Sequence, residues 1–351
     1  MSPTPPPHQE YKLALLGFGN VGQAFLELLL EKASDLAADP GISFRIVGIA
    51  SGSHGQAVNP KGLKLQEVLD AYRAGGALDD FSSRPLGSSE EFLSACKADA
   101  LVETTPVNYQ TGEPALTYLR QALKSGMHAV TANKGPVVHG YRELTSLARK
   151  KGLRFYFESA VMDGAPVFSI ARHGLPGAVV SGFAGILNST TNLILTRMEG
   201  GETQEEAIAY AQSIGIAETD PSGDVDGWDA AVKVSALATV LMDIPLIPEQ
   251  VQRTGIRGLT HDLIQEAAEK GQRWKLVCSA QRDPDSPRGI QAVVQPQLVG
   301  PDSYLYNING TTSIVEIASD VLVKLTLIEE NPSTRTTAYG LLADLLNIFS
   351  S

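Results

Sequence analysis

The chain has 351 residues, which exceeds the usual size of one hydrophobic core and predicts two domains. Its net charge of -11 argues against nucleic acid as a partner, because a phosphate backbone is normally bound by a basic face. Two cysteines, Cys96 and Cys278, are too few for a disulfide framework or a cysteine-built zinc site, and no apolar run is long enough to span a membrane.

The first ten residues read "MSPTPPPHQE" and contain no apolar core of the kind that a signal peptide needs. Their proline-rich, polar composition predicts a disordered tail over 1–10. The low cysteine content fits a reducing compartment. We therefore expect a cytoplasmic protein.

Apolar runs then alternate with segments of helical periodicity. The run "YKLALLGFG" precedes the helical pattern "NVGQAFLELLLEKASDLA", and the alternation continues through "SFRIVGIAS", "LKLQEVLDAYRAGG", "ADALVETT", "EPALTYLRQALKSG", "HAVTANK", "YRELTSLARKKG" and "LRFYFES". Strands that alternate with helices form parallel sheets with right-handed crossovers. The sequence therefore predicts an α/β domain over 11–159.

A different pattern begins at about residue 160. The segment "GETQEEAIAYAQSIG" predicts a helix in which Thr203 and Glu206 form a capping box and Gly215 ends the helix. Further on, "RGIQAVVQPQLVG", "TSIVEIAS" and "VLVKLTLIE" predict strands. We expect a second, α+β domain over 160–328. A final helix, "TTAYGLLADLLNIF", lies within 329–351 and is expected to return to the first domain.

A glycine-rich turn follows the first predicted strand. It has the GxGxxG spacing and consists of Gly17, Phe18, Gly19, Asn20, Val21 and Gly22. Between a strand and a helix, such a turn lets a pyrophosphate approach the backbone and the helix N-terminus. The first domain is therefore predicted to be a Rossmann-type domain that binds NAD(P). The alternative is a glycine-rich turn without a ligand.

The second strand gives information about the nucleotide. An acidic residue normally ends this strand when NAD is preferred, yet no Asp or Glu lies between Gly41 and Glu67. The basic residues of that interval are Arg45, His54, Lys61 and Lys64. NADP is therefore favoured and NAD stays possible, and the alternative is that these residues are ordinary surface charge.

Polar residues also follow the later strands. Glu103, Thr104 and Thr105 follow one strand, and Lys134 lies in the turn "VTANKGP" after the next. Open α/β sheets bind ligands at the carboxyl ends of their strands. These residues are therefore candidates for a ligand site, although a lysine in a turn is more often only solvated.

An acidic stretch, "AETDPSGDVDGWDAAVK", ends at Lys233, which is the only ionisable residue between Ala230 and Met242. A helix that is apolar on every side is normally buried. Its "ETDPSGD" segment is predicted to be a non-helical loop. A structural explanation is also open, in which Asp226 caps the helix and Asp229 pairs with Lys233. Calcium is not favoured, because the spacing lacks the ligand pattern of an EF-hand.

Three segments together resemble homoserine dehydrogenase over nearly the whole chain: "TANKGP", "GILNSTTN" and the acidic stretch. The resemblance implies NAD(P)-dependent interconversion of L-homoserine and L-aspartate 4-semialdehyde, on the route to threonine and methionine. It makes Lys233 and Lys134 catalytic and places Thr104, Thr105 and Lys134 at the cofactor. The residues that it places at the substrate are Glu218, Asp224, Asp229 and Thr190. It also implies a homodimer through the sheet of the second domain.

These roles are chemically reasonable. Carboxylates can pair with the ammonium of an amino-acid substrate. A lysine ammonium can stabilise the oxygen that becomes negative when hydride reaches an aldehyde, and it can then donate a proton.

The chain departs from the family pattern in two places. A glycine-rich segment usually precedes the final helix, whereas this chain reads "ENPSTRTTAYG". A "VGGGxP"-like loop usually holds a monovalent cation, sodium or potassium, whereas this chain reads "VMDGAP", which argues against that site. By resemblance the cation would bind backbone at Glu158, Val161, Asp163 and Ala165.

Two other functions are left open by these departures. One is oxidation of another small hydroxy acid or amino-acid semialdehyde, and the other is a catalytically silent NAD(P)-binding protein. Because no aspartate kinase or ACT domain is recognised, feedback by threonine through such a module is not expected.

Overall fold

The computed structural model describes residues 8–350. The chain divides into two compact units, one made of residues up to Gly164 together with those from Ser333 onward, and the other of Ala165–Pro332. The sequence-based boundaries were placed after residues 159 and 328.

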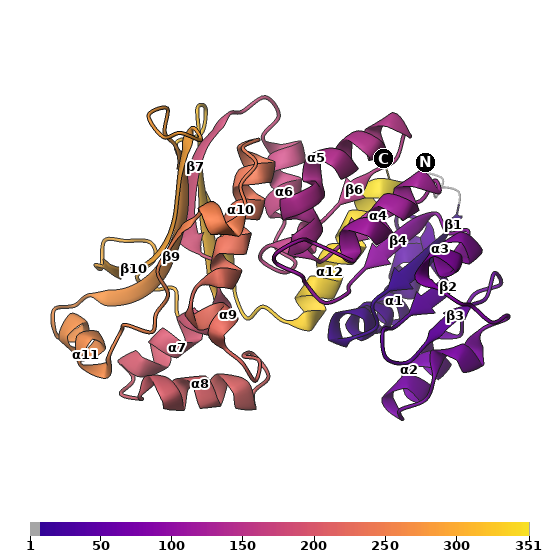
Figure 1. Ribbon diagram of the computed structural model, residues 1–351, viewed down its shortest axis with the longest axis horizontal. Helices are drawn as coiled ribbons and strands as arrows, with labels where there is room; N and C mark the ends of the chain where they lie inside the picture. The colour runs from indigo at the N-terminus through magenta and orange to yellow at the C-terminus, as the bar shows by residue number, and fades with distance from the viewer. Residues whose placement is uncertain (1–7, 351) are drawn as a thin grey trace, which may run out of the picture. The chain divides into compact units, whose positions relative to one another are not determined.

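The first unit contains a six-stranded sheet in the order β3-β2-β1-β4-β5-β6 (Figure 1). Its strands are β1 (Gln9–Leu16), β2 (Ile42–Ala50), β3 (Gln56–Val58), β4 (Ala100–Glu103), β5 (His128–Thr131) and β6 (Phe155–Tyr156). All neighbours are parallel except β2 and β3. The predicted α/β class and Rossmann-type parallel sheet are confirmed.

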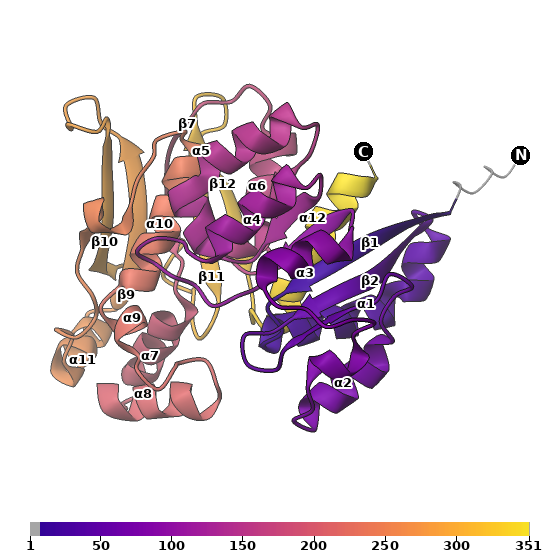
Figure 2. The ribbon, with the colours of Figure 1, turned by 45° about the vertical axis from the view of Figure 1, so that its right-hand side comes forward.

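The helices of this unit cover both faces of the sheet. They are α1 (Asn20–Ala38), α2 (Leu65–Arg73), α3 (Ser89–Cys96), α4 (Ala115–Lys124), α5 (Lys134–Lys150) and α12 (Thr334–Phe349), with short 3-10 helices η1 (Leu78–Phe81) and η2 (Glu158–Ala160). The last helix packs against α1, while α3 contacts α4 and α4 contacts α5 (Figure 2). This is the arrangement that right-handed crossovers produce.

The first strand begins inside the predicted tail. The backbone N–H of Gln9 donates to the carbonyl of Gly41 at 2.8 Å, and Gln9 and Glu10 pair with β2. These two residues are therefore ordered, contrary to the prediction, because the neighbouring strand supplies partners for their backbone. The remainder of the predicted tail, up to residue 7, lies outside the described residues.

The second unit contains a sheet in the order β12-β11-β7-β9-β10-β8. The strands are β7 (Val180–Ile186), β8 (Gln252–Arg253), β9 (Arg273–Arg282), β10 (Ile290–Val299), β11 (Ser313–Ser319) and β12 (Leu325–Glu329). Neighbours are antiparallel except β10 and β8. The sequence did not predict β7, which is rich in glycine, or β9, whose pattern is interrupted by Lys275.

The helices of the second unit include α7 and α10, which pack against β9, and α11, which lies beside both α7 and β9. They are α6 (Val167–Ser169), α7 (Ser189–Glu199), α8 (Gln204–Ser213), α9 (Ser222–Val225), α10 (Trp228–Leu241) and α11 (His261–Glu269), with the short helices η3 (Ile170–Gly174) and η4 (Pro248–Gln250). The predicted capping box of Thr203 and Glu206 at the start of α8 is confirmed.

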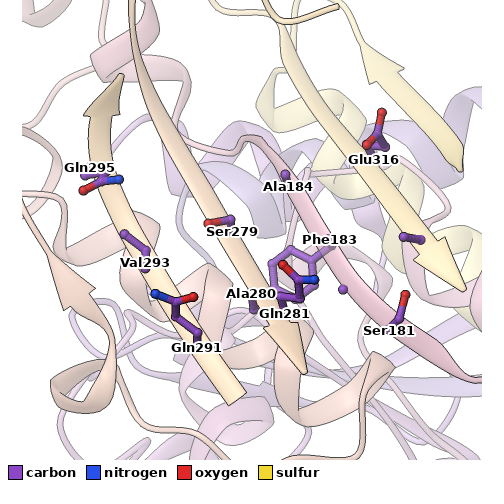
Figure 3. A pocket seen from close by; sticks show the side chains of 12 residues that line it. Ser181, Phe183, Ala184, Ser279, Ala280, Gln281, Gln291, Val293, Gln295 and Glu316 are labelled. Atoms are coloured by element: carbon purple, nitrogen blue, oxygen red, sulfur yellow. The ribbon is translucent and has the colours of Figure 1, made fainter. Parts of the chain in front are cut away.

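Side chains at the start of β10 alternate between the core and the outside. Ile290, Ala292 and Val294 are buried, whereas Gln291 and Gln295 are exposed. The outward side chains border a hollow of about 400 Å³ on the sheet (Figure 3). Among the described residues, no helix combines the length and the apolar character that a bilayer crossing requires.

A lysine is buried inside the second unit. Lys275 of β9 is 0% exposed, and its ammonium donates to the carbonyl of Ile308 at 2.7 Å and to Oδ1 of Asn309 at 3.2 Å. Burial lowers the pKa of Lys275 from 10.5 to about 8, although Glu199 opposes the shift. The protonated lysine is therefore a cost to folding near neutral pH.

We expect Lys275→Met to change how stability depends on pH. Because the folded pKa is depressed, the stability that Lys275 contributes is present above pH 10.5 and is lost as pH falls through 8. The free energy of unfolding of the wild type, measured relative to Lys275→Met by urea titration, should rise between these two values by at most about 3 kcal/mol.

Lys270→Met is the matched control, since Lys270 has an exposed side chain and pairs with Glu266 on the surface. Its difference from the wild type should be nearly constant with pH. A constant difference for Lys275→Met as well would contradict the depressed pKa.

Candidate active site

The glycine turn between β1 and α1 is shaped by backbone contacts. Gly17 has a φ of 101°, and a Cβ added there would lie 2.4 Å from the backbone carbon of Thr104. A Cβ on Gly22 would lie 2.6 Å from the carbonyl oxygen of Gly17, whereas one on Gly19 would meet nothing within 4 Å. Gly17 and Gly22 are thus required by close packing, and Gly19 leaves the backbone open to a ligand.

The N-terminus of α1 is suited to bind an anion. Its N-cap, Gly19, supplies no side-chain hydrogen bond, and no acidic residue lies in the first turn. The first N–H groups and the helix dipole can therefore act on a phosphate. This geometry fits a dinucleotide held by the turn and by backbone at Asn20 and Val21. The Phe18 side chain is 1% exposed and packs on Tyr72, so Phe18 can offer only its backbone.

Hydroxyl groups and a histidine follow β2. Ser53 Oγ lies 2.7 Å from His54 Nδ1, Ser51 Oγ lies 3.5 Å from Ser53 Oγ, and the His54 ring lies against Tyr72. None of these side chains is a carboxylate, as the sequence indicated, whereas the carboxylate of Asp79, further along the chain, lies beside Gly55.

Two of the four basic residues near β2 are already paired. Arg45 forms an ion pair with Glu10 at 2.5 Å, and Lys64 forms one with Glu67 at 2.7 Å. These contacts agree with ordinary surface charge for Arg45 and Lys64.

The residues after β4 and β5 lie at the carboxyl end of the sheet. Thr104 Oγ1 donates to the carbonyl of Gly17 at 2.8 Å, which links this loop to the glycine turn. Lys134, expected in a turn, is instead the first residue of α5, whose N-cap is Asn133. Its position is therefore set by a helix cap.

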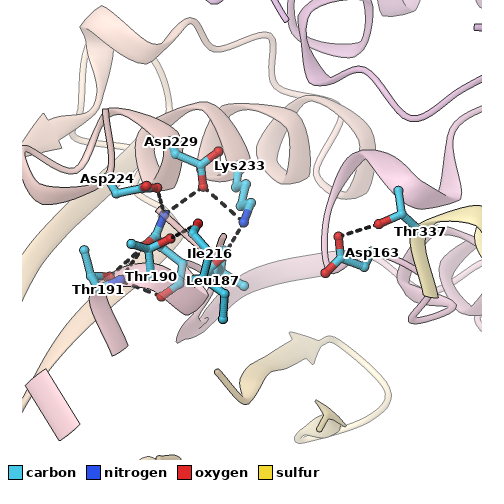
Figure 4. Close-up of polar contacts among 10 residues, drawn as sticks. Asp163, Leu187, Thr190, Thr191, Ile216, Asp224, Asp229, Lys233 and Thr337 are labelled. Carbon is cyan, nitrogen blue, oxygen red and sulfur yellow. Dashed lines mark hydrogen bonds and ion pairs between the residues drawn. The ribbon is translucent and has the colours of Figure 1, made fainter. Parts of the chain in front are cut away.

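In the second unit, Lys233 and two carboxylates form one polar cluster (Figure 4). Lys233 Nζ lies 3.1 Å from Asp229 Oδ2 and donates to the carbonyl of Leu187 at 2.6 Å. The Asn188 amide donates to Asp224 Oδ1 at 2.6 Å and to Asp229 Oδ2 at 2.9 Å. The expected ion pair of Asp229 with Lys233 is confirmed, on a helix that is otherwise almost wholly buried.

The protonation of Asp224 depends on its burial and on the neighbouring charge of Asp229. Burial, followed by the negative charge of Asp229, raises the pKa of Asp224, while Asn188, Lys233 and Thr190 oppose the rise. Thr190, predicted at the substrate, also donates to the carbonyl of Ile216 at 3.3 Å. The cluster is therefore a partly desolvated acidic site that could bind a cationic group.

Glu218 is not part of this cluster. Its side chain is exposed, and Gln212 donates to its backbone carbonyl at 3.1 Å. The structure thus brings together Asp224, Asp229, Lys233 and Thr190, but not the Glu218 carboxylate.

The loop before α10 differs from its prediction in two ways. Ser222–Val225 forms the short helix α9, although "ETDPSGD" was predicted to be non-helical. The N-cap of α10 is Gly227, and Asp226 instead forms an ion pair with Arg257. A glycine with φ of 78° makes the tight link between the two helices, which displaces Asp226 from the cap position.

Asn188 is the residue that the sequence analysis missed. It is 3% exposed, and its Oδ1 accepts from the backbone N–H of Thr191 at 2.8 Å as the N-cap of α7. An asparagine ahead of "STT" is a recognisable capping signal. That signal does not reveal the second contact, which reaches carboxylates far along the chain.

The segment predicted to bind a cation has competing contacts. The carbonyl of Ala165 accepts from Val167 at 2.8 Å, and a Cβ on Gly340 would lie 3.0 Å from the carbonyl oxygen of Asp163. The Asp163 carboxylate accepts from Thr337 at 3.0 Å (Figure 4). The backbone N–H of Glu158 donates to the Asp344 carboxylate at 2.7 Å. One of the four carbonyls, that of Ala165, is therefore already engaged by the backbone. The described residues include no cluster of His, Cys, Asp and Glu that could hold a metal.

We expect Asn188→Ser to raise the pKa of Asp224 further. Serine can keep the cap of α7, but it lacks the amide that stabilises the ionised carboxylate. The measurement is a ¹³C NMR titration of the aspartate carboxyl groups.

Asn192→Ser is the control, because it removes an amide from the same helix that donates to the carbonyl of Thr312 and not to Asp224. It should leave the pKa of Asp224 unchanged. An unchanged or lower pKa of Asp224 in Asn188→Ser would show that the amide does not stabilise the ionised carboxylate.

Comparisons with known proteins identify related families for both units of the chain. The family described as homoserine dehydrogenase matches residues 166–346, and the one described as homoserine dehydrogenase, NAD binding domain, matches residues 17–158. A Pseudomonas canavaninivorans protein named NAD(+)-dependent homoserine dehydrogenase is 37% identical over 343 residues, 97% of each chain. A homoserine dehydrogenase of Methanocaldococcus jannaschii is 32% identical and covers 97% of this chain and 98% of its own.

A solved structure leads to the same family. The structure of a hyperthermophilic archaeal homoserine dehydrogenase in complex with NADPH is 27% identical, with a TM-score of 0.80, and covers 97% of this chain and 98% of its own. With the matches to both halves of the chain, it confirms the resemblance that the sequence indicated, and we conclude that the chain belongs to the homoserine dehydrogenase family.

Proposed function

We propose that this protein interconverts L-homoserine and L-aspartate 4-semialdehyde with NAD(P), on the route to threonine and methionine. The observation that carries the proposal is the cluster of Lys233, Asp229, Asn188 and Asp224. It combines a proton-donating ammonium with carboxylates suited to the ammonium of an amino acid. Family membership and the glycine turn support the same reaction.

Each side chain has a separate role in this proposal. Asp224, Asp229 and Thr190 hold the substrate, with Glu218 joining them only if its exposed side chain turns inward. Lys233 holds a proton at Nζ while Asp229 and the carbonyl of Leu187 fix its position. Lys134, at the start of α5, is the second lysine that can stabilise or protonate the substrate oxygen.

The cofactor would be held by the glycine turn, by Thr104 and Thr105, and by Lys134. When bound, the nicotinamide supplies or accepts the hydride. We propose that NADP is favoured, because Ser51, Ser53 and His54 follow β2 in place of a carboxylate. Among relatives, one is named NAD(+)-dependent and another is solved with NADPH, so both nucleotides occur in the family.

A homodimer through the sheet of the second unit is also proposed. The outward face of β7, β9, β10 and β11 supports it, since small side chains such as Ala184 and Ala318 there leave room for a partner. No step is assigned to a monovalent cation. The cytoplasmic location stays a prediction from the sequence.

We expect NADP to bind at least as tightly as NAD in isothermal titration. Ser51→Asp should weaken NADP binding about tenfold and spare NAD, because a carboxylate there repels a 2′-phosphate. Ser94→Asp is the control, since it adds the same charge at an exposed position on α3, and it should change the affinity for neither NADP nor NAD. NAD binding about tenfold tighter than NADP in the wild type would refute the preference.

We expect Lys233→Met to reduce kcat for L-homoserine by about a hundredfold or more, the usual effect of losing a general acid. NADP affinity should persist. Asp229 keeps the hydrogen bond from Asn188, so the stability loss should stay within about 1 to 3 kcal/mol. NADP reduction in a spectrophotometer and thermal denaturation measure the two effects.

Lys134→Met and the double variant show which lysine dominates proton transfer, and Lys270→Met, the same change on an exposed lysine, serves as control. A panel of other small hydroxy acids tests the substrate. A folded Lys233→Met enzyme within about threefold of the wild-type kcat would exclude Lys233 from the chemistry.

A further inference from the structure

A buried carboxylate lies at the end of β4, and no step proposed above uses it. Glu103 is 0% exposed. Its Oε1 accepts from the backbone N–H of Thr105 at 2.7 Å and from Thr105 Oγ1 at 2.5 Å, and its Oε2 accepts from Thr131 Oγ1 at 2.5 Å. Burial raises the pKa of Glu103, while these hydrogen bonds oppose the rise.

The hydrogen bonds continue from Thr131 to the start of α5. Thr131 Oγ1 accepts from the backbone N–H of Asn133 at 2.9 Å. Asn133 Oδ1 accepts from the N–H of Gly135 at 2.9 Å, and Asn133 Nδ2 donates to the carbonyl of Thr105 at 3.2 Å. Glu103, Thr131, Asn133 and Thr105 thus form a closed ring, which we call the Glu103 ring.

The register of the sheet makes this ring possible. Glu103 and Thr131 are paired residues of the parallel strands β4 and β5, each at the last position of its strand. The ring therefore joins the two loops that leave the sheet there. One loop carries Thr105 and the other carries Lys134, the first residue of α5.

The ring requires that both carboxylate oxygens of Glu103 accept hydrogen bonds, Oε1 from Thr105 and Oε2 from Thr131. Burying a carboxylate is costly unless hydrogen bonds compensate it, and an apolar residue at this strand end would avoid the cost. A glutamine could keep the contact with Thr105 through its oxygen. Its amide would then face Thr131, whose hydroxyl proton would lose its acceptor.

We propose that Glu103 is a positioning residue, whose carboxylate holds the loop after β4 and the first turn of α5 in one arrangement and so places Thr105 and Lys134. The inference rests on the proposed function, since that assigns Thr105 and Lys134 to the cofactor and the reaction. Glu103 itself acts only through its neighbours in the ring.

Three variants test the ring: Glu103→Gln, Thr131→Val and the double variant. Both single changes break the same link, so each should lower kcat for L-homoserine or weaken NADPH binding by about tenfold, and the double should do little more than either single. NADPH fluorescence titration gives the dissociation constant, and thermal denaturation is recorded beside it. Thr131→Val keeps the test open if Glu103→Gln does not fold.

Thr145→Val is the matched control, because it removes a hydroxyl from α5 for which the structure shows no hydrogen-bond partner. It should leave kcat and NADPH binding unchanged. Lower melting temperatures with kcat and NADPH affinity both within about threefold of the wild type would overturn the proposal, as would single effects that add fully in the double variant.

The two proposals can fail separately. A wild type that binds NADPH but does not oxidise L-homoserine would refute the proposed function. NADPH affinities of the same variants would then decide the role of Glu103, since the ring also places Thr105.

Discussion

The carboxylates of Asp224 and Asp229 lie close together in a partly buried part of the second unit, and the candidate site is arranged so that their repulsion is compensated. Asp224 and Asp229 are tolerated because Asn188 donates to both and Lys233 neutralises one of them. Removal of either donor would leave charge uncompensated in a partly buried setting, which is costly. The cap of α7, the tight link at Gly227 and the apolar surroundings of α10 all hold these groups in place.

The first unit also contains a buried carboxylate, but its charge is compensated in a different way. Glu103 has no counter-ion among its hydrogen-bond partners, and hydroxyl and backbone donors compensate its burial instead. In each unit, one side chain with several hydrogen-bond partners joins separate segments of the chain: Asn188 joins the start of α7 to Asp224 and Asp229, and Glu103 joins the loops after β4 and β5. Such hydrogen-bonded networks favour one arrangement of loops over others.

Much of the fold could be predicted because buried parallel strands are continuous apolar runs between helical patterns. Strands β7 and β9 escaped prediction, since glycines weaken the pattern of one and Lys275, buried by partners remote in sequence, interrupts the other. In the site, the pair of Asp229 and Lys233 follows from helical spacing alone. The bridge from Asn188 to both carboxylates could not be predicted, because it depends on how α7 packs near α9 and α10.

The last helix has a consequence for how the chain is made. Its buried residues, among them Ala338, Leu341 and Leu345, belong to the same core as Leu13, Leu15 and Phe25 near the other end of the sequence. A ribosome therefore releases everything needed for the contiguous second unit before it releases the segment that completes the first. During synthesis the surface of α1 that receives α12 therefore stays uncovered from the time α1 emerges until α12 follows it, and the first unit can complete its core only then.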